Sequence, residues 1–272
     1  MSPAWNHCVP EKKIEVVMGW RIPEALKERS GQADAGKSVD PFSICNMCSI
    51  SVSVFKSENL YAEGDAAGHV FVVKSGLCFS FRYDEDGRRQ IIDLAFPGDF
   101  AGLEALTQRR FVSSVSALTQ AELVAYPVDD FTRQCYAEPA LSRALVECIA
   151  KEHAILTKRL MGVAHSPASQ RIAHFLLEVR SRALASSKLH PVSESARNRA
   201  LITANGDFNL KLPQAIIADT LGLSIVHVSR TLSKLKEDGL IEDSSAGLRY
   251  RNLDGLKELA LWEGVSPWLE AG

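Results

Sequence analysis

The sequence predicts an α+β protein in which an N-terminal β-roll is joined by a long helix to a C-terminal winged helix-turn-helix domain. Three patterns support this prediction. Short strand-like segments cut by glycine-containing turns fill residues 51–138, whereas residues 139–164 show a helical apolar period. Two short amphipathic helices then meet at Gly222, and a pair of short strands follows them.

The composition is that of a globular protein. The chain has 272 residues, 46% of them apolar and 24% charged, and 31 Lys plus Arg against 33 Asp plus Glu leave a formal charge of −2. These values argue against a disordered or collagen-like chain and allow one or two domains with real cores. The sequence has no apolar run of about 18 residues and no secretory signal pattern at its start, so we expect a cytoplasmic protein that does not enter the membrane.

Residues 1–50 are predicted to be an N-terminal extension with a Cys-x-x-Cys motif, and residues 51–138 a sensor domain built as a β-roll. Turns rich in glycine, proline and aspartate, such as Asp84-Glu-Asp-Gly87, separate the predicted strands. Regularly spaced short strands of this kind favour a barrel or roll. The strands are expected at Val70–Val73, Leu77–Tyr83, Gln90–Phe96 and Ala121–Val128.

Residues 139–164 are predicted to form a dimerisation helix. Apolar residues recur at every third or fourth position from Leu141 to Val163, and about 24 residues at about 1.5 Å each make a rod of roughly 36 Å. Such a rod has more apolar surface than one small roll covers, so a second copy is the natural cover and we expect a homodimer. Cys148 is expected to face this seam. The alternative is a helix that packs only against its own domain.

Residues 165–272 are predicted to be the winged helix-turn-helix domain. A first helix carries a helical apolar pattern from Ile172 to Val179, and the polar, turn-rich residues 185–206 indicate a long insertion after it. Leu240–Ile241 and Leu248–Arg251 flank a short turn and are expected to form the two-stranded wing.

The helix-turn-helix carries the most informative pattern. Pro213 starts a short helix, Gly222 supplies the tight turn, and Ser224 caps the second helix. An α-helix fits the major groove of DNA, where its N-terminal residues reach base edges while cations hold phosphates. Arg230 suits a bidentate contact to guanine, and Lys234 and Lys236 suit phosphate contacts. The candidate DNA-binding residues are Gln214, Ser224, Ile225, Val226, His227, Ser229, Arg230, Ser233 and Lys234.

Residues 45–260 carry an ordered set of motifs around the long central helix. The motifs are Gly64-Asp65, Lys74-Ser-Gly76, Asp86-Gly-Arg-Arg-Gln90, Phe96-Pro-Gly-Asp-Phe100, Leu221-Gly-Leu-Ser224 and Val228-Ser-Arg-Thr-Leu232. This ordered set resembles the catabolite-activator and fumarate-nitrate-reduction regulator (CRP/FNR) superfamily, on its FNR/FixK-like side. The resemblance implies a homodimeric transcription factor with a cyclic-nucleotide-binding-like roll, which binds a palindromic site in double-stranded promoter DNA. Activators of this family also contact RNA polymerase, and we expect an activator.

Two positions depart from the family pattern. FNR-type recognition helices carry a glutamate where this chain has Val226, which offers only apolar contact, for instance to a thymine methyl group. We therefore predict a half-site that differs from the usual FNR one at that base pair. The Arg-Ser pair that binds cyclic AMP in CRP-type rolls is replaced by Phe111-Val112, so cyclic AMP is not the expected ligand, although Arg109 and Arg110 lie close by.

The cysteines allow several signals. Cys45-Asn-Met-Cys48 resembles two of the iron–sulfur ligands of FNR, but the remaining two ligand positions fall on Val54 and Val124. An iron–sulfur cluster or a zinc ion with Cys45, Cys48 and Cys8 as ligands is one hypothesis. Cys78 or Cys135 are other substitutes for the missing ligands. Thiol-based redox sensing, another small-molecule signal and a chain without a cofactor stay open as alternatives.

A second class of function is a ligand- or metal-binding cupin-like module with no role in DNA regulation. This hypothesis leaves the helix-turn-helix pattern unexplained. The seven histidines form no evident metal-binding pattern, and the sequence has no phosphate loop, nucleophile elbow or His-Glu-x-x-His helix. We therefore expect a transcription regulator and not an enzyme.

Overall fold

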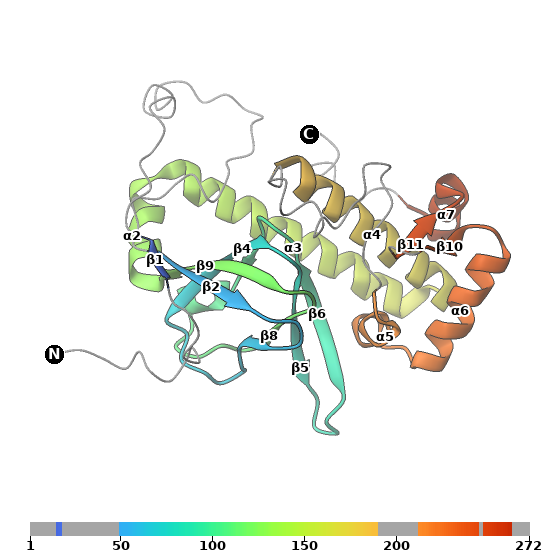
Figure 1. The fold of residues 1–272 in the computed structure, drawn as a ribbon, viewed down its shortest axis with the longest axis horizontal. Helices are drawn as coiled ribbons and strands as arrows, with labels where there is room; N and C mark the ends of the chain where they lie inside the picture. The colour runs from blue at the N-terminus through green and yellow to red at the C-terminus, as the bar shows by residue number, and fades with distance from the viewer. Residues whose placement is uncertain (1–14, 18–48, 190–211, 245–246, 263–272) are drawn as a thin grey trace. The chain divides into compact units, whose positions relative to one another are not determined.

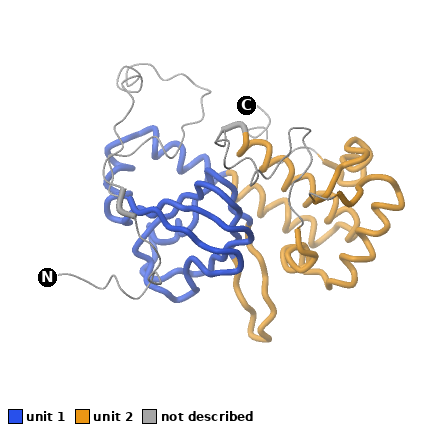
Figure 2. The backbone as a smooth tube through the Cα atoms, in the orientation of Figure 1, with its two compact units in different colours: residues 1–80, 94–150 blue, residues 81–93, 151–272 orange. Residues whose placement is uncertain are grey.

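The computed structural model describes residues 15–17, 49–189, 212–244 and 247–262 of the chain (Figure 1). The chain divides into two compact units (Figure 2). Unit 1 comprises Met1–Ser80 and Leu94–Ala150, and unit 2 comprises Phe81–Asp93 and Lys151–Gly272.

Most of the roll belongs to unit 1, and residues 81–93 of its strands β5 and β6 are grouped with unit 2. The strands of the roll form two sheets. The five-stranded sheet has the order β1-β2-β9-β4-β7, and the four-stranded sheet has the order β3-β8-β5-β6. The four strands expected from the sequence are present as β4, β5, β6 and β9. The bounds are β1 Glu15–Val17, β2 Ser49–Val54, β3 Asn59–Tyr61, β4 His69–Ser75, β5 Cys78–Tyr83, β6 Arg89–Ala95, β7 Phe100–Ala101, β8 Ser114–Ala117 and β9 Ala121–Pro127, with a 3₁₀ turn at Leu103–Leu106.

Buried apolar side chains of the strands form the hydrophobic core of the roll. The run Val70–Val73 of β4 is buried throughout, and Leu123 of β9 pairs with Val73 in the register of the sheet. Gly76 makes the next turn with φ of +83°, where an added Cβ would lie 2.3 Å from the carbonyl oxygen of Gln120. Only glycine tolerates both conditions, which explains the Lys-Ser-Gly pattern at this turn.

Two helices follow the roll: α2 (Val128–Ala137) and α3 (Pro139–His165). The 27 residues of α3 make a rod of about 40 Å. The apolar positions of α3 divide between two faces. Leu141 is buried, and Leu145 and Cys148 pack against the core of the roll. The expectation that Cys148 faces a dimer seam is therefore wrong, because it packs against its own chain.

Unit 2 holds the helix-turn-helix and its wing (Figure 1). Helix α4 packs against α5, α6 and α7, and Phe175, Leu176 and Val228 are among the buried side chains of this unit. The predicted insertion starts too early, since α4 continues through residues 185–189; the rest of the insertion lies outside the described residues. The bounds are α4 Ala168–Leu189, α5 Gln214–Leu221, α6 Ile225–Glu237, β10 Ile241–Asp243, β11 Leu248–Tyr250 and α7 Leu253–Ala260.

Among the described helices, no single one has the length and apolar composition needed to cross a membrane. Helices α5 and α6 meet these two criteria only when they are counted together, as a pair bent by 110°.

Candidate nucleic-acid interface

The turn between α5 and α6 follows the local signals in the sequence. Gly222 ends α5 in the left-handed conformation (φ 61°, ψ 42°), and the backbone N–H of Leu223 donates to the carbonyl of Ala218 at 3.0 Å. The hydroxyl oxygen of Ser224 accepts a hydrogen bond from the backbone N–H of His227 at 3.2 Å. A left-handed residue at the end of one helix and a serine cap at the start of the next produce a helix-turn-helix with a bend of 110°.

Helix α6 has one buried and one exposed face. Val228, Leu232 and Leu235 are buried and hold the helix against unit 2. The opposite face is exposed, and its apolar positions are 54% (Ile225) and 60% (Val226) accessible. The structure therefore gathers the residues that the sequence nominates for DNA contact. Exposed are Gln214, Ser224, Ile225, Val226, His227, Arg230, Ser233 and Lys234, and Ser229 is half-buried.

The cationic side chains of this helix differ in whether they are already paired within the chain. The side chains of Arg230 and Lys234 make no hydrogen bond or ion pair with any residue that the structure describes. Lys236, in contrast, donates to Asp243 of the wing at 2.6 Å. The side chain of Arg230 is thus available for a contact outside the described part of the chain, whereas that of Lys236 is engaged by Asp243.

The wing adds cations that sequence analysis did not assign. Arg249 of β11 lies directly opposite Glu242 of β10 and donates to it at 3.1 Å, and Arg251 contacts the same carboxylate at 3.4 Å. Both arginines are exposed. The sequence offered no signal for this pairing, because Glu242 lies beyond the predicted strand Leu240–Ile241 and the register of the wing was open.

The wing is anchored to α4. The hydroxyl of Tyr250 donates to the carbonyl of Leu176 at 2.9 Å, and the Arg180 guanidinium lies 5.5 Å from the centre of the tyrosine ring. Burial raises the pKa of this hydroxyl, so it stays a hydrogen-bond donor at any physiological pH.

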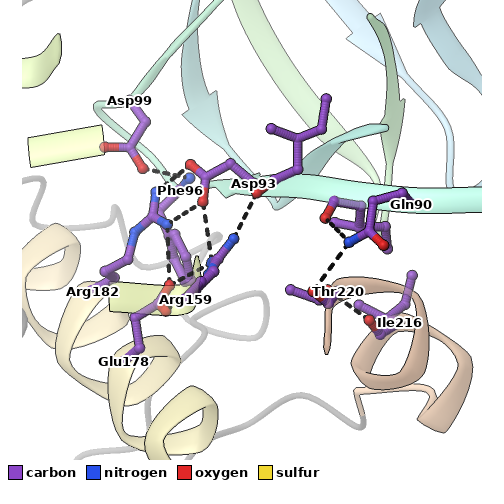
Figure 3. A network of polar contacts seen from close by, with 11 residues as sticks. Gln90, Asp93, Phe96, Asp99, Arg159, Glu178, Arg182, Ile216 and Thr220 are labelled. Carbon is purple, nitrogen blue, oxygen red and sulfur yellow. Dashed lines mark hydrogen bonds and ion pairs between the residues drawn. The ribbon is translucent and has the colours of Figure 1, made fainter. Parts of the chain in front are cut away.

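A buried ion network also holds α4, through its residues Glu178 and Arg182 (Figure 3). Arg159 of α3 makes two hydrogen bonds to Glu178 of α4, at 2.6 and 3.1 Å, and Arg182 makes two to Asp93, at 2.7 and 3.1 Å. Arg159 also contacts Asp93 at 3.3 Å, and Arg182 approaches Glu178 to 3.6 Å. Two cations and two carboxylates thus form one neutral cluster that links three segments of unit 2.

The roll places aromatic side chains where the resemblance puts the cyclic AMP contact. Phe111 is buried and its ring stacks on Tyr61 with centroids 3.7 Å apart, next to Phe71. Arg110 is exposed and donates to the carbonyl of Gly64 at 2.6 Å. At the position of the expected Arg-Ser pair this chain therefore presents a buried aromatic ring.

Most of the cysteines proposed as cluster ligands lie outside the residues that the structure describes. Cys8, Cys45 and Cys48 all lie there. Val54 and Val124, at the two other ligand positions of the resemblance, are built into β2 and β9 and offer no donor atom. Burial raises the pKa of the Cys78 thiol to about 12, which disfavours a thiolate ligand. Within the described ranges no three His, Cys, Asp or Glu side chains gather as metal ligands do.

Comparisons with known proteins agree with this architecture. Residues 52–137 match the family model of the cyclic nucleotide-binding domain, and residues 170–259 match that of the Crp-like helix-turn-helix domain. The chain is 27% identical over 209 residues to the transcriptional activator protein Anr of Pseudomonas aeruginosa, which covers 77% of this chain and 79% of that protein. It is 29% identical over 192 residues to the nitrogen fixation regulation protein FixK of Bradyrhizobium diazoefficiens, which covers 70% and 73% of the two chains.

Solved structures show the same fold. FixK2 from Bradyrhizobium japonicum superimposes with a TM-score of 0.66 at 25% identity, covering 78% of this chain and 98% of that one. A CRP-family regulator from Thermus thermophilus superimposes with a TM-score of 0.61, and at 21% identity it supports the fold alone; it covers 81% of this chain and 100% of that one.

A β-roll followed by a winged helix-turn-helix with an exposed recognition helix defines a DNA-binding transcription regulator. The chain belongs to the CRP/FNR family of these regulators. The predicted family, fold class and role as a DNA-binding transcription regulator are thereby confirmed, and the alternative of a cupin-like module without a regulatory role receives no support. The relatives named above are transcription regulators and not enzymes, and regulators of this family bind promoter DNA, typically as dimers.

Proposed function

We propose that this regulator activates transcription in the cytoplasm by binding palindromic promoter DNA as a homodimer and contacting RNA polymerase. The observation that carries the proposal is the exposed face of α6, where Val226 and Arg230 stand beside the capped N-terminus of the helix. Similarity to the transcriptional activator protein Anr supports activation rather than repression.

The exposed face of α3 supports the homodimer. Its apolar side chains follow the alternating spacing of three and four residues that coiled-coil seams use. One polar residue, His153, interrupts the seam, and a polar residue at such a position specifies the register of two paired helices. The seam positions are Val146, Ile149, His153, Leu156, Leu160 and Val163. Two chains paired along this seam would present two recognition helices to half-sites one DNA turn apart, about 34 Å.

The test of this function is a gel shift on a library of genomic fragments, followed by anisotropy titrations on the fragments retained. Arg230→Ala is expected to weaken binding by about 1–3 kcal/mol per half-site, because a bidentate contact to guanine is lost. Arg133→Ala removes an exposed arginine of α2 and is the matched control, with no change expected. A protein that retains no fragment, or that binds equally well with Arg230→Ala, would contradict the proposal.

Val226 is predicted to set the preference at one base pair of the half-site. Its side chain is 60% accessible and has only methyl groups to offer, which favours contact with a thymine methyl. Val226→Glu would offer an acceptor to the cytosine amine, so binding-site selection is expected to recover a different base at this position, with discrimination of about 1–3 kcal/mol.

The matched control is Val112→Glu, the same change at an exposed position of the roll, which should leave the selected site unchanged. Recovery of the usual FNR-type half-site by the unaltered protein would show this prediction to be wrong.

The signal that the regulator senses stays a prediction from the sequence. A cluster bound by Cys45, Cys48 and Cys8 would colour the protein brown after anaerobic purification, with visible absorbance that air removes. A colourless protein would contradict the cluster and favour thiol-based sensing or another small molecule.

A further inference from the structure

The hairpin Phe81–Asp93 belongs to the unit that contains the helix-turn-helix (Figure 2). Two of its side chains contact α5. The guanidinium of Arg89 donates to one oxygen of Asp219 with two nitrogens, at 2.8 and 2.7 Å. The side-chain amide of Gln90 donates to the carbonyl of Thr220 at 3.2 Å (Figure 3). Two neighbouring side chains of the hairpin thus hold two neighbouring residues of α5.

These contacts lie at the end of α5 that leads into the recognition helix. The last carbonyls of a helix have no partner within it and need one from elsewhere. The carbonyl of Thr220 receives Gln90, and that of Leu221 receives the guanidinium of Arg171. Only residues 222–224 separate α5 from α6, so the direction of α6 follows the position of this helix end.

The base of the hairpin is fixed to two other helices. The carbonyl of Ile92 accepts a hydrogen bond from Arg159 of α3 at 2.6 Å, and Asp93 holds Arg182 of α4 (Figure 3). The tip is closed by Asp84, whose side chain accepts from the backbone N–H groups of Asp86 and Arg88 at 3.0 and 2.9 Å. One short segment of the hairpin, residues 89–93, therefore contacts α5 as well as α3 and α4.

We propose that the hairpin is a strut that sets the direction of the recognition helix, with Arg89 and Gln90 as positioning residues. Neither residue belongs to the exposed face of α6, so each acts on DNA binding only through α5. The inference rests on the proposed dimer at a palindromic site, because a fixed helix direction selects one distance between half-sites. Loss of the strut leaves the contacts within each half-site intact, but the protein then discriminates less between different distances separating the two half-sites.

The test measures affinity for three DNA probes by fluorescence anisotropy: the palindrome selected by the unaltered protein, the same half-sites moved apart by one base pair, and a single half-site. Arg89→Ala is expected to reduce the preference for the selected spacing by about 2- to 150-fold, the range that couplings between contacting residues produce. Affinity for the single half-site should change by less than about two-fold. The salt dependence of binding should be unchanged, because the number of phosphate contacts is the same.

Two further variants separate positioning from a general loss of structure. Exchange of the charges by Arg89→Asp with Asp219→Arg is expected to restore the spacing preference, and Gln90→Met, which removes the bond to Thr220 without a change of charge, should relax it. Arg88→Ala is the matched control, since its ion pairs with Asp84 and Asp86 stay within the hairpin.

The strut is overturned if Arg89→Ala keeps the wild-type spacing preference, weakens the single half-site as much as the palindrome, or is not rescued by the charge exchange. If the unaltered protein and Arg88→Ala bind no DNA, the proposed function itself fails.

Discussion

Glu178→Ala is expected to destabilise the unit that carries the helix-turn-helix by about 3–5 kcal/mol, since removing one partner of a buried ion pair leaves an uncompensated charge. Glu178 and Arg182 are each 2% accessible and Arg159 is 9% accessible. The network is neutral with all four charges in place, and the substitution leaves two guanidinium groups against the single carboxylate of Asp93.

The electrostatics of Arg159 show what holds the network together. Burial by itself lowers the pKa of its guanidinium, but the attraction of Glu178 and Asp93 outweighs burial and the pKa lies above its ordinary value. The carboxylates therefore compensate for the loss of hydration. An arginine that keeps its charge at every accessible pH cannot relieve the loss of Glu178 by giving up a proton.

The measurement is chemical unfolding followed by circular dichroism. If the variant and the unaltered protein have the same dependence of unfolding free energy on denaturant concentration, the shift of the midpoint gives the loss of stability. Glu147→Ala is the matched control, because it removes the same side chain from the exposed pair with Arg143 on α3 and should cost no more than about 0.5 kcal/mol. A loss below about 1 kcal/mol for Glu178→Ala would show that water reaches the network and replaces the missing carboxylate.

This network also marks the limit of what could be predicted from the sequence. The helix-turn-helix was predictable because its signals are local: Gly222 and Ser224 lie two residues apart, and the buried face of α6 repeats at the helical period. The bonds of the network join residues up to 89 positions apart, and the contact of Arg89 with Asp219 spans 130. No local periodicity reports which distant carboxylate an arginine meets.

The candidate DNA interface shows the same division. The sequence placed Arg230 and Lys234 on the outer face of α6, where the structure has them exposed. It offered Lys236 as a phosphate contact without its partner Asp243, and it did not assign Arg249 or Arg251. Helical period fixes which way a residue faces, whereas the pairing of charges depends on the register of the wing, which the sequence pattern leaves open.

Helix α3 was predicted in outline and corrected in detail. Its length and apolar content followed from the period of three or four, but the sequence treated all apolar positions as one seam. The structure assigns Leu141, Leu145 and Cys148 to the chain's own core and leaves a second stripe exposed. This stripe contains Leu156 and Leu160, so the surface that we propose for dimerisation lies on a different face of the helix from Cys148.

Leu160→Glu is therefore expected to convert the dimer into a monomer. Leu160 is 70% accessible in the single chain, so a carboxylate there is hydrated and the chain keeps its fold. In a symmetric dimer the same substitution buries two like charges next to each other in the seam. Affinity for the palindrome should fall by about 10²- to 10⁴-fold, because each half-site is then bound without the effective concentration that the partner chain supplies.

Met161→Glu is the matched control, since it introduces the same charge at the adjacent exposed residue, one position outside the alternating pattern of the seam. Light scattering after size-exclusion chromatography gives the mass of each variant, and the anisotropy titration gives its affinity for the palindrome and for a single half-site. If the Leu160→Glu monomer binds the single half-site with the affinity of the unaltered protein, its weaker binding to the palindrome results entirely from the loss of dimerisation. A Leu160→Glu protein that stays dimeric, or a Met161→Glu protein that dissociates equally, would show that the chains pair through a different face, because a buried like-charge pair in the seam is incompatible with a stable dimer.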